Sequence, residues 1–334
     1  MAFRVGIIGG GGIARAHGRA AQNVDAADLV AVCDVSAEAA AKFGDEFGVE
    51  ERYTDIDEML DKAGLDLVVI CTWGCFHAEI GKRVARSGKV RGILCEKPFC
   101  DTAAQAEEMI AAAEEGGVML AEAFKFRHHP QHLKAKEIID AGEIGPVRHI
   151  RSTFTIAADP TFMTPAHNWR FDPKRSGGAV YDLGCYNIHH ARFIAGGDPV
   201  KVHASGQIGE VSGVDESVAA LLEFPGGLTA QLSLTFRYFN SQVAEIYGES
   251  GYLRIERAWN NENSPTVLEA EFKDGSRARY DFAPVDQFAL QLAHTLECLE
   301  KGTPHRISLE NSLGNMRTID AVFAAIKSGE AVRI

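Results

Sequence analysis

The segment Val5-Gly6-Ile7-Ile8-Gly9-Gly10-Gly11-Gly12-Ile13-Ala14 decides the fold of the first part of this chain. It contains G-x-G-x-x-A at Gly9, Gly11 and Ala14, directly after an apolar run and at the start of a helix-like stretch. Gly9 permits a tight turn, Gly11 lets the backbone approach a pyrophosphate, and small Ala14 allows close helix packing. The first N–H groups of such a helix bind phosphates. We therefore expect Gly9, Gly11, Gly12, Ile13 and Ala14 to contact a dinucleotide.

An acidic residue ends the next apolar run. Leu29-Val30-Ala31-Val32-Cys33 is followed by Asp34, 20 residues beyond Ala14, where a carboxylate can accept hydrogen bonds from both ribose hydroxyls. The same carboxylate would repel the 2′-phosphate of NADP. The sequence therefore favours NAD over NADP, with dual use still open. The structural alternative is a plain glycine turn in which Asp34 caps a helix.

The chain from residue 3 to about 124 alternates apolar runs with amphipathic segments of helix length. Such a pattern is typical of a parallel sheet that helices cover on both faces. We predict a doubly wound α/β Rossmann domain over residues 1–124, with strands at 3–9, 28–34, 65–72, 92–96 and 118–124.

The remainder, residues 125–334, predicts an α+β domain for substrate binding and oligomerisation. Short turns such as Pro225-Gly226-Gly227 link most of its strands, so we expect an open, mainly antiparallel sheet. Helices are expected at about 130–141, 178–195, 286–301 and 309–328. The expected strands are 147–156, 200–209, 217–224, 228–236, 244–257 and 267–272.

Composition restricts the partners. The formal net charge of −12 argues against a nucleic-acid or anionic-membrane surface and favours a small-molecule substrate. No run of about 18 apolar residues and no signal-peptide pattern is present, so we expect a cytoplasmic protein. Seven cysteines without a CxxC pair are interpreted as reduced, buried residues.

Two further patterns carry chemistry. The strand at 92–96 leads into Cys95-Glu96-Lys97-Pro98, at the sheet edge where open α/β folds bind ligands. Neighbouring charges can tune the pKa of a lysine there; the alternative is a surface ion pair of Glu96 with Lys97. In the inserted helix, Asp182, Tyr186 and His190 are spaced by four residues and share one face. They can handle a proton or, alternatively, serve only in packing.

Several histidines are adjacent in the sequence and suggest a metal site: His128, His129, His132, His189 and His190. Adjacent residues on a helix point about 100° apart, and no cysteine or acid completes a ligand set. We therefore expect no metal, and interpret these residues as polar helix surface or pocket lining.

Together these motifs resemble the Gfo/Idh/MocA family, named for glucose-fructose oxidoreductase, inositol dehydrogenase and a rhizopine-catabolism protein. The resemblance covers essentially the whole chain. It rests on the glycine turn, His17, Glu96-Lys97-Pro98, Arg127 with Pro130, and Gly177-Gly178 followed by Asp182-x-Gly184-x-Tyr186. It implies a Rossmann domain and a second domain whose open sheet often mediates dimers or tetramers.

The resemblance also implies roles for individual residues. Lys97 would contact the reacting hydroxyl and the nicotinamide ribose, and Asp182 would hold substrate. At the position of Tyr186, inositol dehydrogenase-like members carry a histidine that accepts the proton. The tyrosine is instead similar to the glucose-fructose oxidoreductase, dihydrodiol and xylose dehydrogenase branch, as is Asn168-Trp169-Arg170-Phe171-Asp172-Pro173.

That branch implies an aldose or pyranoside substrate, but several of its members prefer NADP and lack an acid like Asp34. A second departure is Trp73, because the family usually has Thr-Pro-Asn before the histidine that corresponds to His77. We also expect Thr72, His77, Glu96 and Lys97 to contact the cofactor. Arg127, Trp169, Arg170 and His190 are expected to line the sugar pocket with Lys97, Asp182 and Tyr186.

The sequence therefore predicts an NAD(H)-dependent oxidoreductase that acts on a hydroxyl or carbonyl carbon of a sugar or polyol. Lys97 would hydrogen-bond the hydroxyl, and Tyr186, or water that it orients, would take the proton. An ordinary phenol has a pKa near 10 and needs a cation nearby to act as a base at neutral pH, so the two residues should act together. Two alternatives remain: an NAD-dependent redox glycosidase and a catalytically silent NAD-binding sensor.

Overall fold

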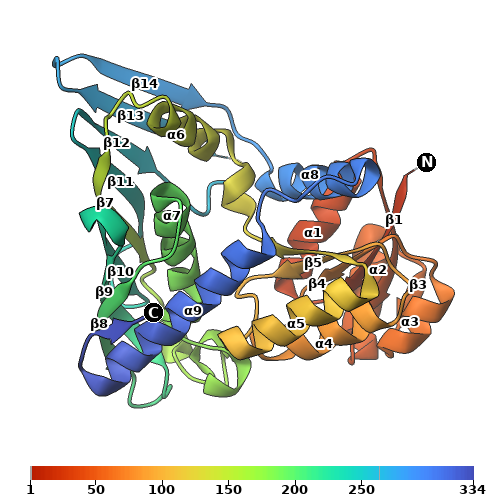
Figure 1. The fold of residues 1–334 in the computed structure, drawn as a ribbon. Coiled ribbons are helices and arrows are strands. Elements are labelled where there is room, and N and C mark those ends of the chain that lie inside the picture. Colours follow the sequence, from red (N-terminus) through yellow and green to blue (C-terminus); the bar gives the residue numbers. More distant parts are fainter. Residues whose placement is uncertain (1, 263) are drawn as a thin grey trace. The chain divides into compact units, whose positions relative to one another are not determined.

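The computed structural model describes residues 2–262 and 264–334. The chain divides into two compact units, one of residues 1–125 with 286–313, and one of residues 126–285 with 314–334. The first unit is drawn in red to yellow in Figure 1, with residues 286–313 in blue. It contains a parallel sheet of six strands in the order β3-β2-β1-β4-β5-β6. Its strands are β1 (Phe3–Ile8), β2 (Ala27–Cys33), β3 (Glu51–Tyr53), β4 (Leu67–Ile70), β5 (Gly92–Glu96) and β6 (Met119–Ala123).

Helices cover both faces of this sheet, which explains why its central strands are apolar throughout. Residues of α1, α2 and α8 share one core with the strands, while α4 and α5 pack together elsewhere on the unit. This confirms the predicted doubly wound α/β fold. The helices are α1 (Gly12–Gln22), α2 (Ala37–Phe47), α3 (Ile56–Lys62), α4 (Gly74–Arg86), α5 (Ala103–Gly116) and α8 (Gln287–Lys301).

Residues 286–313 differ from the predicted domain division, because they pack with the first unit although the sequence analysis placed them in the second domain. The cause is the apolar face of α8. Phe288, Leu292, Leu296 and Leu299 are buried in the same core as β1 and β4. The helix α9 (Leu309–Ser328) begins in the first unit and continues in the second.

The second unit is built on a mixed sheet of nine strands in the order β14-β13-β12-β11-β7-β10-β9-β8-β15. All pairs are antiparallel except β7 with β10. This confirms the predicted mainly antiparallel sheet. Its strands are β7 (Val147–Thr155), β8 (Lys201–Ile208), β9 (Asp215–Glu223), β10 (Thr229–Thr235), β11 (Ser241–Gly248), β12 (Gly251–Glu256), β13 (Thr266–Phe272), β14 (Arg277–Phe282) and β15 (Val332–Arg333).

Several helices pack on this sheet. The helix α6 (Pro130–Asp140) contacts β12, β13 and β14, and α7 (Cys185–Ala195) contacts β7 and β10. A π-helical turn, Val180–Gly184, precedes α7 directly, so the helix predicted at 178–195 begins with a wider turn than expected. This turn carries Asp182.

The strand predictions miss some elements for identifiable reasons. β3, β14 and β15 are short or polar, so they lack the apolar run that marks a strand. The strand expected at 244–257 is a hairpin of β11 and β12, joined at Glu249 and Ser250. The parallel β7–β10 pair joins strands that are far apart in sequence, so turn length carries no information about it.

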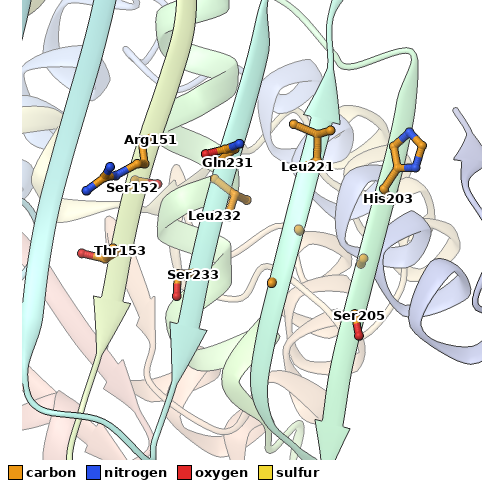
Figure 2. Close-up of a pocket in the computed structure, with 12 residues that line it drawn as sticks. Arg151, Ser152, Thr153, His203, Ser205, Leu221, Gln231, Leu232 and Ser233 are labelled. Atoms are coloured by element: carbon orange, nitrogen blue, oxygen red, sulfur yellow. The ribbon is translucent and has the colours of Figure 1, made fainter.

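One stretch of the nine-stranded sheet is open on one face, which Figure 2 shows with the helices behind the strands. Two rows of side chains cross the strands β7, β10, β9 and β8 there. The first row is Arg151, Gln231, Leu221 and His203, and the second is Thr153, Ser233, Ala219 and Ser205. Both rows line a hollow of about 530 Å³ on this face, and the small side chains of the second row leave room for it.

The structure also describes possible membrane-spanning helices, the cysteines and possible metal-binding groups. Among residues 2–262 and 264–334, no helix has the length and apolar character needed to cross a membrane. All seven cysteines are free, and six of them are buried. Within the same described ranges, no group of three or more His, Cys, Asp or Glu side chains is arranged to hold a metal ion.

Candidate functional site

The glycine turn joins β1 to α1 in a conformation that only glycine adopts easily. Gly9 has φ +97°, and a Cβ atom there would lie 2.9 Å from the backbone of Cys71, at the end of β4. The turn is therefore pressed against the neighbouring strand. This agrees with the tight turn expected from the sequence.

Gly11 and Gly12, the last two glycines of the turn, leave open space in front of the helix. A Cβ atom at Gly11 or at Gly12 would meet no atom within 4 Å. Gly11 is the N-cap of α1 and supplies no side-chain cap, and the first turn of the helix contains no acid. The N–H groups of this turn can therefore bind an anion, so the segment fits a pyrophosphate.

Asp34 follows β2 and is held by two backbone N–H groups. Its Oδ2 accepts a hydrogen bond from Gly10 N at 2.7 Å, and its Oδ1 accepts one from Ser36 N at 2.8 Å. These bonds fix the carboxylate beside the glycine turn. A carboxylate has about four lone-pair sites, so capacity remains for the hydroxyls of a ribose.

His77 lies in the first turn of α4 and connects two loops. Its Nδ1 is 2.8 Å from the carbonyl oxygen of Pro98, and its Nε2 is 3.0 Å from that of Thr72. The side chain is 1% exposed, and burial lowers its pKa below the ordinary value. Trp73, at the N-cap of α4, is partly exposed.

Lys97 follows β5 and is preceded by a buried acid. The Glu96 Oε1 atom is 2.7 Å from His17 Nε2, and its Oε2 accepts a hydrogen bond from the N–H of Lys97 at 3.2 Å. Burial opposes ionisation of Glu96, but the hydrogen bond and charge of His17, together with Lys97, outweigh it and lower the pKa of Glu96. The carboxylate that precedes Lys97 is thus kept charged.

A second group of predicted residues comes together within the second unit. Arg170 Nε donates a hydrogen bond to Asp182 Oδ2 at 2.7 Å, and its guanidinium lies 4.7 Å from the centre of the Trp169 ring. Asp182 is almost fully buried, whereas 40% of the Arg170 side chain is exposed. The three residues form one polar and aromatic cluster.

Tyr186 and His190 lie on α7 among aromatic rings of the same unit. The Tyr186 ring centre is 5.6 Å from that of Phe154 and 5.9 Å from that of Phe126. His190 is fully buried against His132 and Trp259, and no hydrogen-bond partner is present for either ring nitrogen among the described residues.

The remaining candidate residue of the second unit is Arg127. Its Nη1 lies 2.8 Å from His189 Nε2, and its guanidinium is 3.7 Å from the centre of the Phe193 ring. Burial, followed by the charge of Arg127, lowers the pKa of His190 to about 3. A histidine in this environment stays neutral at ordinary pH.

The sequence analysis did not identify Asp215, a buried acid that fixes the turn carrying Asp182 in the second unit. Asp215, at the start of β9, accepts a hydrogen bond from Val180 N at 2.7 Å, at the beginning of the turn that carries Asp182. Any side chain on Gly178, which has φ +112°, would collide with the Asp215 carboxylate. Burial raises the pKa of Asp215 to about 7. The glycine pair is the only sequence signal of this contact.

The predicted residues thus form two groups. The first unit brings together the cofactor candidates, including Asp34, His77, Glu96 and Lys97. The second unit contains Arg127, Trp169, Arg170, Asp182, Tyr186 and His190, and Arg170 in it contacts both Trp169 and Asp182.

Known proteins resemble the chain over its full length. A D-xylose 1-dehydrogenase (NADP⁺) from Haloferax volcanii is 29% identical over 98% of this chain and 99% of its own. The structure of an aldose-aldose oxidoreductase from Caulobacter crescentus, in complex with glycerol, matches with a TM-score of 0.90 and 26% identity, covering 100% of both chains.

A third similar protein is a 3-ketoreductase from Actinomadura kijaniata, solved in complex with NADP. It has a TM-score of 0.88 and 29% identity over 97% of this chain and 98% of its own. Variants of that reductase have also been solved in which a lysine is replaced by alanine or glutamate, or a tyrosine by phenylalanine.

Two family models match consecutive parts of the chain. Residues 3–124 match the oxidoreductase family with an NAD-binding Rossmann fold, and residues 132–254 match the C-terminal domain of the same GFO/IDH/MocA family. Together they cover well over half of the chain, so it belongs to the GFO/IDH/MocA family of oxidoreductases.

Proposed function

We propose that this protein is an NAD(H)-dependent dehydrogenase that interconverts a hydroxyl and a carbonyl on a sugar or polyol. The observation that carries the proposal is the placement of Lys97 directly after a buried, charged Glu96, at the carboxyl end of a strand in the dinucleotide-binding sheet. Ligands of open α/β sheets bind at that end of the strands. The similar proteins that act on xylose and on aldoses support a sugar substrate.

Lys97, Tyr186 and Asp182 are proposed to act on the same substrate molecule. NAD⁺, when bound, would supply the hydride acceptor. Lys97 would donate a hydrogen bond to the reacting hydroxyl, and Tyr186 would take the proton as that hydroxyl becomes a carbonyl. A lysine and a tyrosine were also the residues substituted in the similar reductase, which supports Lys97 and Tyr186 as candidates.

The cluster of Trp169, Arg170 and Asp182 suits a molecule rich in hydroxyls. Asp182 accepts and Arg170 donates hydrogen bonds, and an indole ring packs well against the C–H face of a pyranose. These features favour an aldose or pyranoside. Arg127 and His190 would pack behind the residues that contact the sugar, since both are buried against aromatic rings.

A screen of NADH absorbance against aldoses, inositols and glycosides at mildly alkaline pH tests the proposal. We expect net NADH formation with a free sugar or polyol, and a kcat at least about 100-fold lower for Lys97→Ala, since the charged donor that holds and polarises the reacting hydroxyl is lost. The affinity of the variant for NADH should change by less than about threefold.

The competing functions give different results in the same screen. Bond cleavage without net NADH formation would indicate a redox glycosidase. Tight NADH binding with no turnover across the panel would indicate a sensor. Full activity of Lys97→Ala would refute the role of Lys97.

The proton acceptor can be identified by comparing Tyr186→Phe with His190→Ala. Since His190 is fully buried and its pKa is lowered to about 3, we expect Tyr186→Phe to lose at least about tenfold in kcat. His190→Ala should instead lower the thermal stability, because it leaves a cavity between His132 and Trp259. The opposite pattern, with kcat retained in Tyr186→Phe and lost in His190→Ala, would make His190 the acceptor.

The preference for NAD rests on Asp34. Two backbone N–H groups hold its carboxylate beside the glycine turn, where it can accept hydrogen bonds from the ribose and repel a 2′-phosphate. The xylose dehydrogenase uses NADP⁺ and the ketoreductase structure contains NADP, so the cofactor choice differs from these proteins if Asp34 acts in this way.

Steady-state kinetics of Asp34→Ser with both cofactors tests this preference. We expect the ratio of kcat/KM for NAD to that for NADP to fall by at least about tenfold, which corresponds to about 1.4 kcal/mol. An unchanged ratio, or a wild-type enzyme that prefers NADP, would show that Asp34 does not select the cofactor.

We also propose that the open sheet face binds a second copy of this chain, giving a homodimer or, with further contacts, a homotetramer. The first row of side chains in Figure 2 continues across the sheet with charges of alternating sign. The residues of this continuation are Arg151, Glu245, Arg254, Glu269 and Arg279. In a two-fold interface the same patch meets itself, so alternating charges can pair across it.

The hollow over Thr153, Ser233, Ala219 and Ser205 should accept side chains of the partner copy. Ser233→Arg, which fills it with a charge, should therefore lower the mass measured by light scattering to that of a single chain. Ala111→Arg, at an exposed small residue of the first unit, is the matched control and should remain oligomeric. Wild type that is monomeric, or Ser233→Arg that keeps its mass, would contradict this interface.

A further inference from the structure

We propose that His17 and His77 are positioning residues, which fasten the Lys97 loop to two segments that bind the cofactor. The inference rests on the proposed role of Lys97 and adds the coupling of that residue to dinucleotide binding. The loop is held on both sides of Lys97, through Glu96 before it and through Pro98 after it.

The first connection runs from α1. His17 lies on the helix whose N-terminus forms the phosphate-binding turn, and its Nε2 is 2.7 Å from Glu96 Oε1. Both side chains are at least 95% buried, so water does not compete for this contact. The other oxygen of Glu96 accepts the N–H of Lys97. One carboxylate therefore links the cofactor helix to the peptide that carries Lys97.

The second connection runs from the loop after β4. The His77 ring lies between the carbonyl oxygens of Thr72, in that loop, and Pro98, next to Lys97. A neutral imidazole carries one N–H, so it donates to one of the two carbonyls, whereas the protonated ring can donate to both. In either form the ring sets the spacing of the two loops.

These connections have a mechanical consequence. When a dinucleotide binds to the first turn of α1 and to the Thr72 loop, any shift of those segments is passed to Lys97 by buried, nearly incompressible contacts. A misplacement of about 1 Å in a catalytic group can cost about 100-fold in rate. Cofactor binding should therefore change the reactivity of the Lys97 amine beyond the effect of direct contact, and loss of either histidine should remove this additional change.

A purely structural role is the alternative, and the same unit offers a control. His305 is also buried, and its Nδ1 accepts a hydrogen bond from Ile307 N at 3.1 Å, while its ring lies against His294 of α8. His305→Leu therefore removes a buried, hydrogen-bonded histidine of the first unit without touching the Lys97 loop.

The experiment compares the full-length wild type with His17→Leu, His17→Gln, His77→Leu and His305→Leu. Reductive methylation of Lys97, followed by mass spectrometry of its peptide, measures the reactivity of the amine with and without NADH. We expect NADH to change the methylation rate at least about threefold in wild type and His305→Leu. A smaller change is expected in His17→Leu and His77→Leu, where only the direct contact of the cofactor with Lys97 remains.

The conservative variant and the kinetics separate positioning from folding. Gln can place an N–H near the position of His17 Nε2, so His17→Gln should recover most of the NADH effect. In the assay, His17→Leu should lower kcat about 10- to 100-fold with KM for NAD changed less than about threefold. If His17→Leu is insoluble, His17→Asn, which is too short to reach Glu96, replaces it.

The inference is overturned if NADH alters Lys97 methylation equally in wild type, His17→Leu and His77→Leu, or if His305→Leu loses the effect as well. These results are independent of turnover. Full activity of Lys97→Ala would overturn the proposed function instead, so the two failures are distinguishable.

Discussion

The buried contact between Glu96 and His17 is the constraint on which the position of Lys97 in the first unit depends. A carboxylate withdrawn from water costs several kcal/mol unless it is paired, and removing one partner of a buried pair typically costs about 3–5 kcal/mol. Glu96 is 4% exposed and keeps its charge because His17 and the N–H of Lys97 compensate for the lost water. The backbone on both sides of that carboxylate is therefore fixed, and with it the start of the Lys97 side chain.

Buried acids also fix the backbone in the second unit. Asp182 is almost fully buried and paired with Arg170, while Asp215 caps the turn that carries Asp182 from a distant strand. Gly178 is required because no side chain fits between that turn and the Asp215 carboxylate. In both units, a buried acid thus accepts a backbone N–H at or near a residue that is proposed to meet the substrate. Loops fixed in this way can hold a substrate group with little loss of entropy on binding.

Much of this arrangement could be predicted from the sequence, because it depends on local patterns. The strand, glycine turn and helix from Val5 to Ala14, followed by Asp34, specify the dinucleotide-binding half through spacing alone. The hairpin of β11 and β12 was predicted as one strand, because strand-like residues continue on both sides of its short turn at Glu249 and Ser250. The strand β14 was not predicted, because charged residues interrupt any apolar run in it. The role of α8 depends on which core its apolar face finds, and periodicity does not contain that information.

The candidate site, like the fold, could be predicted from the sequence only in part. Lys97 and Asp182 were predicted as site residues because they lie in recognisable motifs, and their roles stay proposals. By contrast, the contacts of His17 with Glu96, of His77 with Pro98, and of Asp215 with Val180 join residues 79, 21 and 35 positions apart. No single-sequence pattern connects residues at such distances. They come together only when the sheets have formed, and they decide how the motif residues are held.

The central claim is that the protein removes hydrogen from a carbon of a sugar or polyol and passes it to a nicotinamide cofactor. Its most direct test uses a substrate deuterated at the reacting carbon, with proton NMR of the NADH recovered after turnover. We expect one deuterium at nicotinamide C4 per carbonyl formed. Recovery of NADH without deuterium, or carbonyl formation without reduced cofactor, would contradict it.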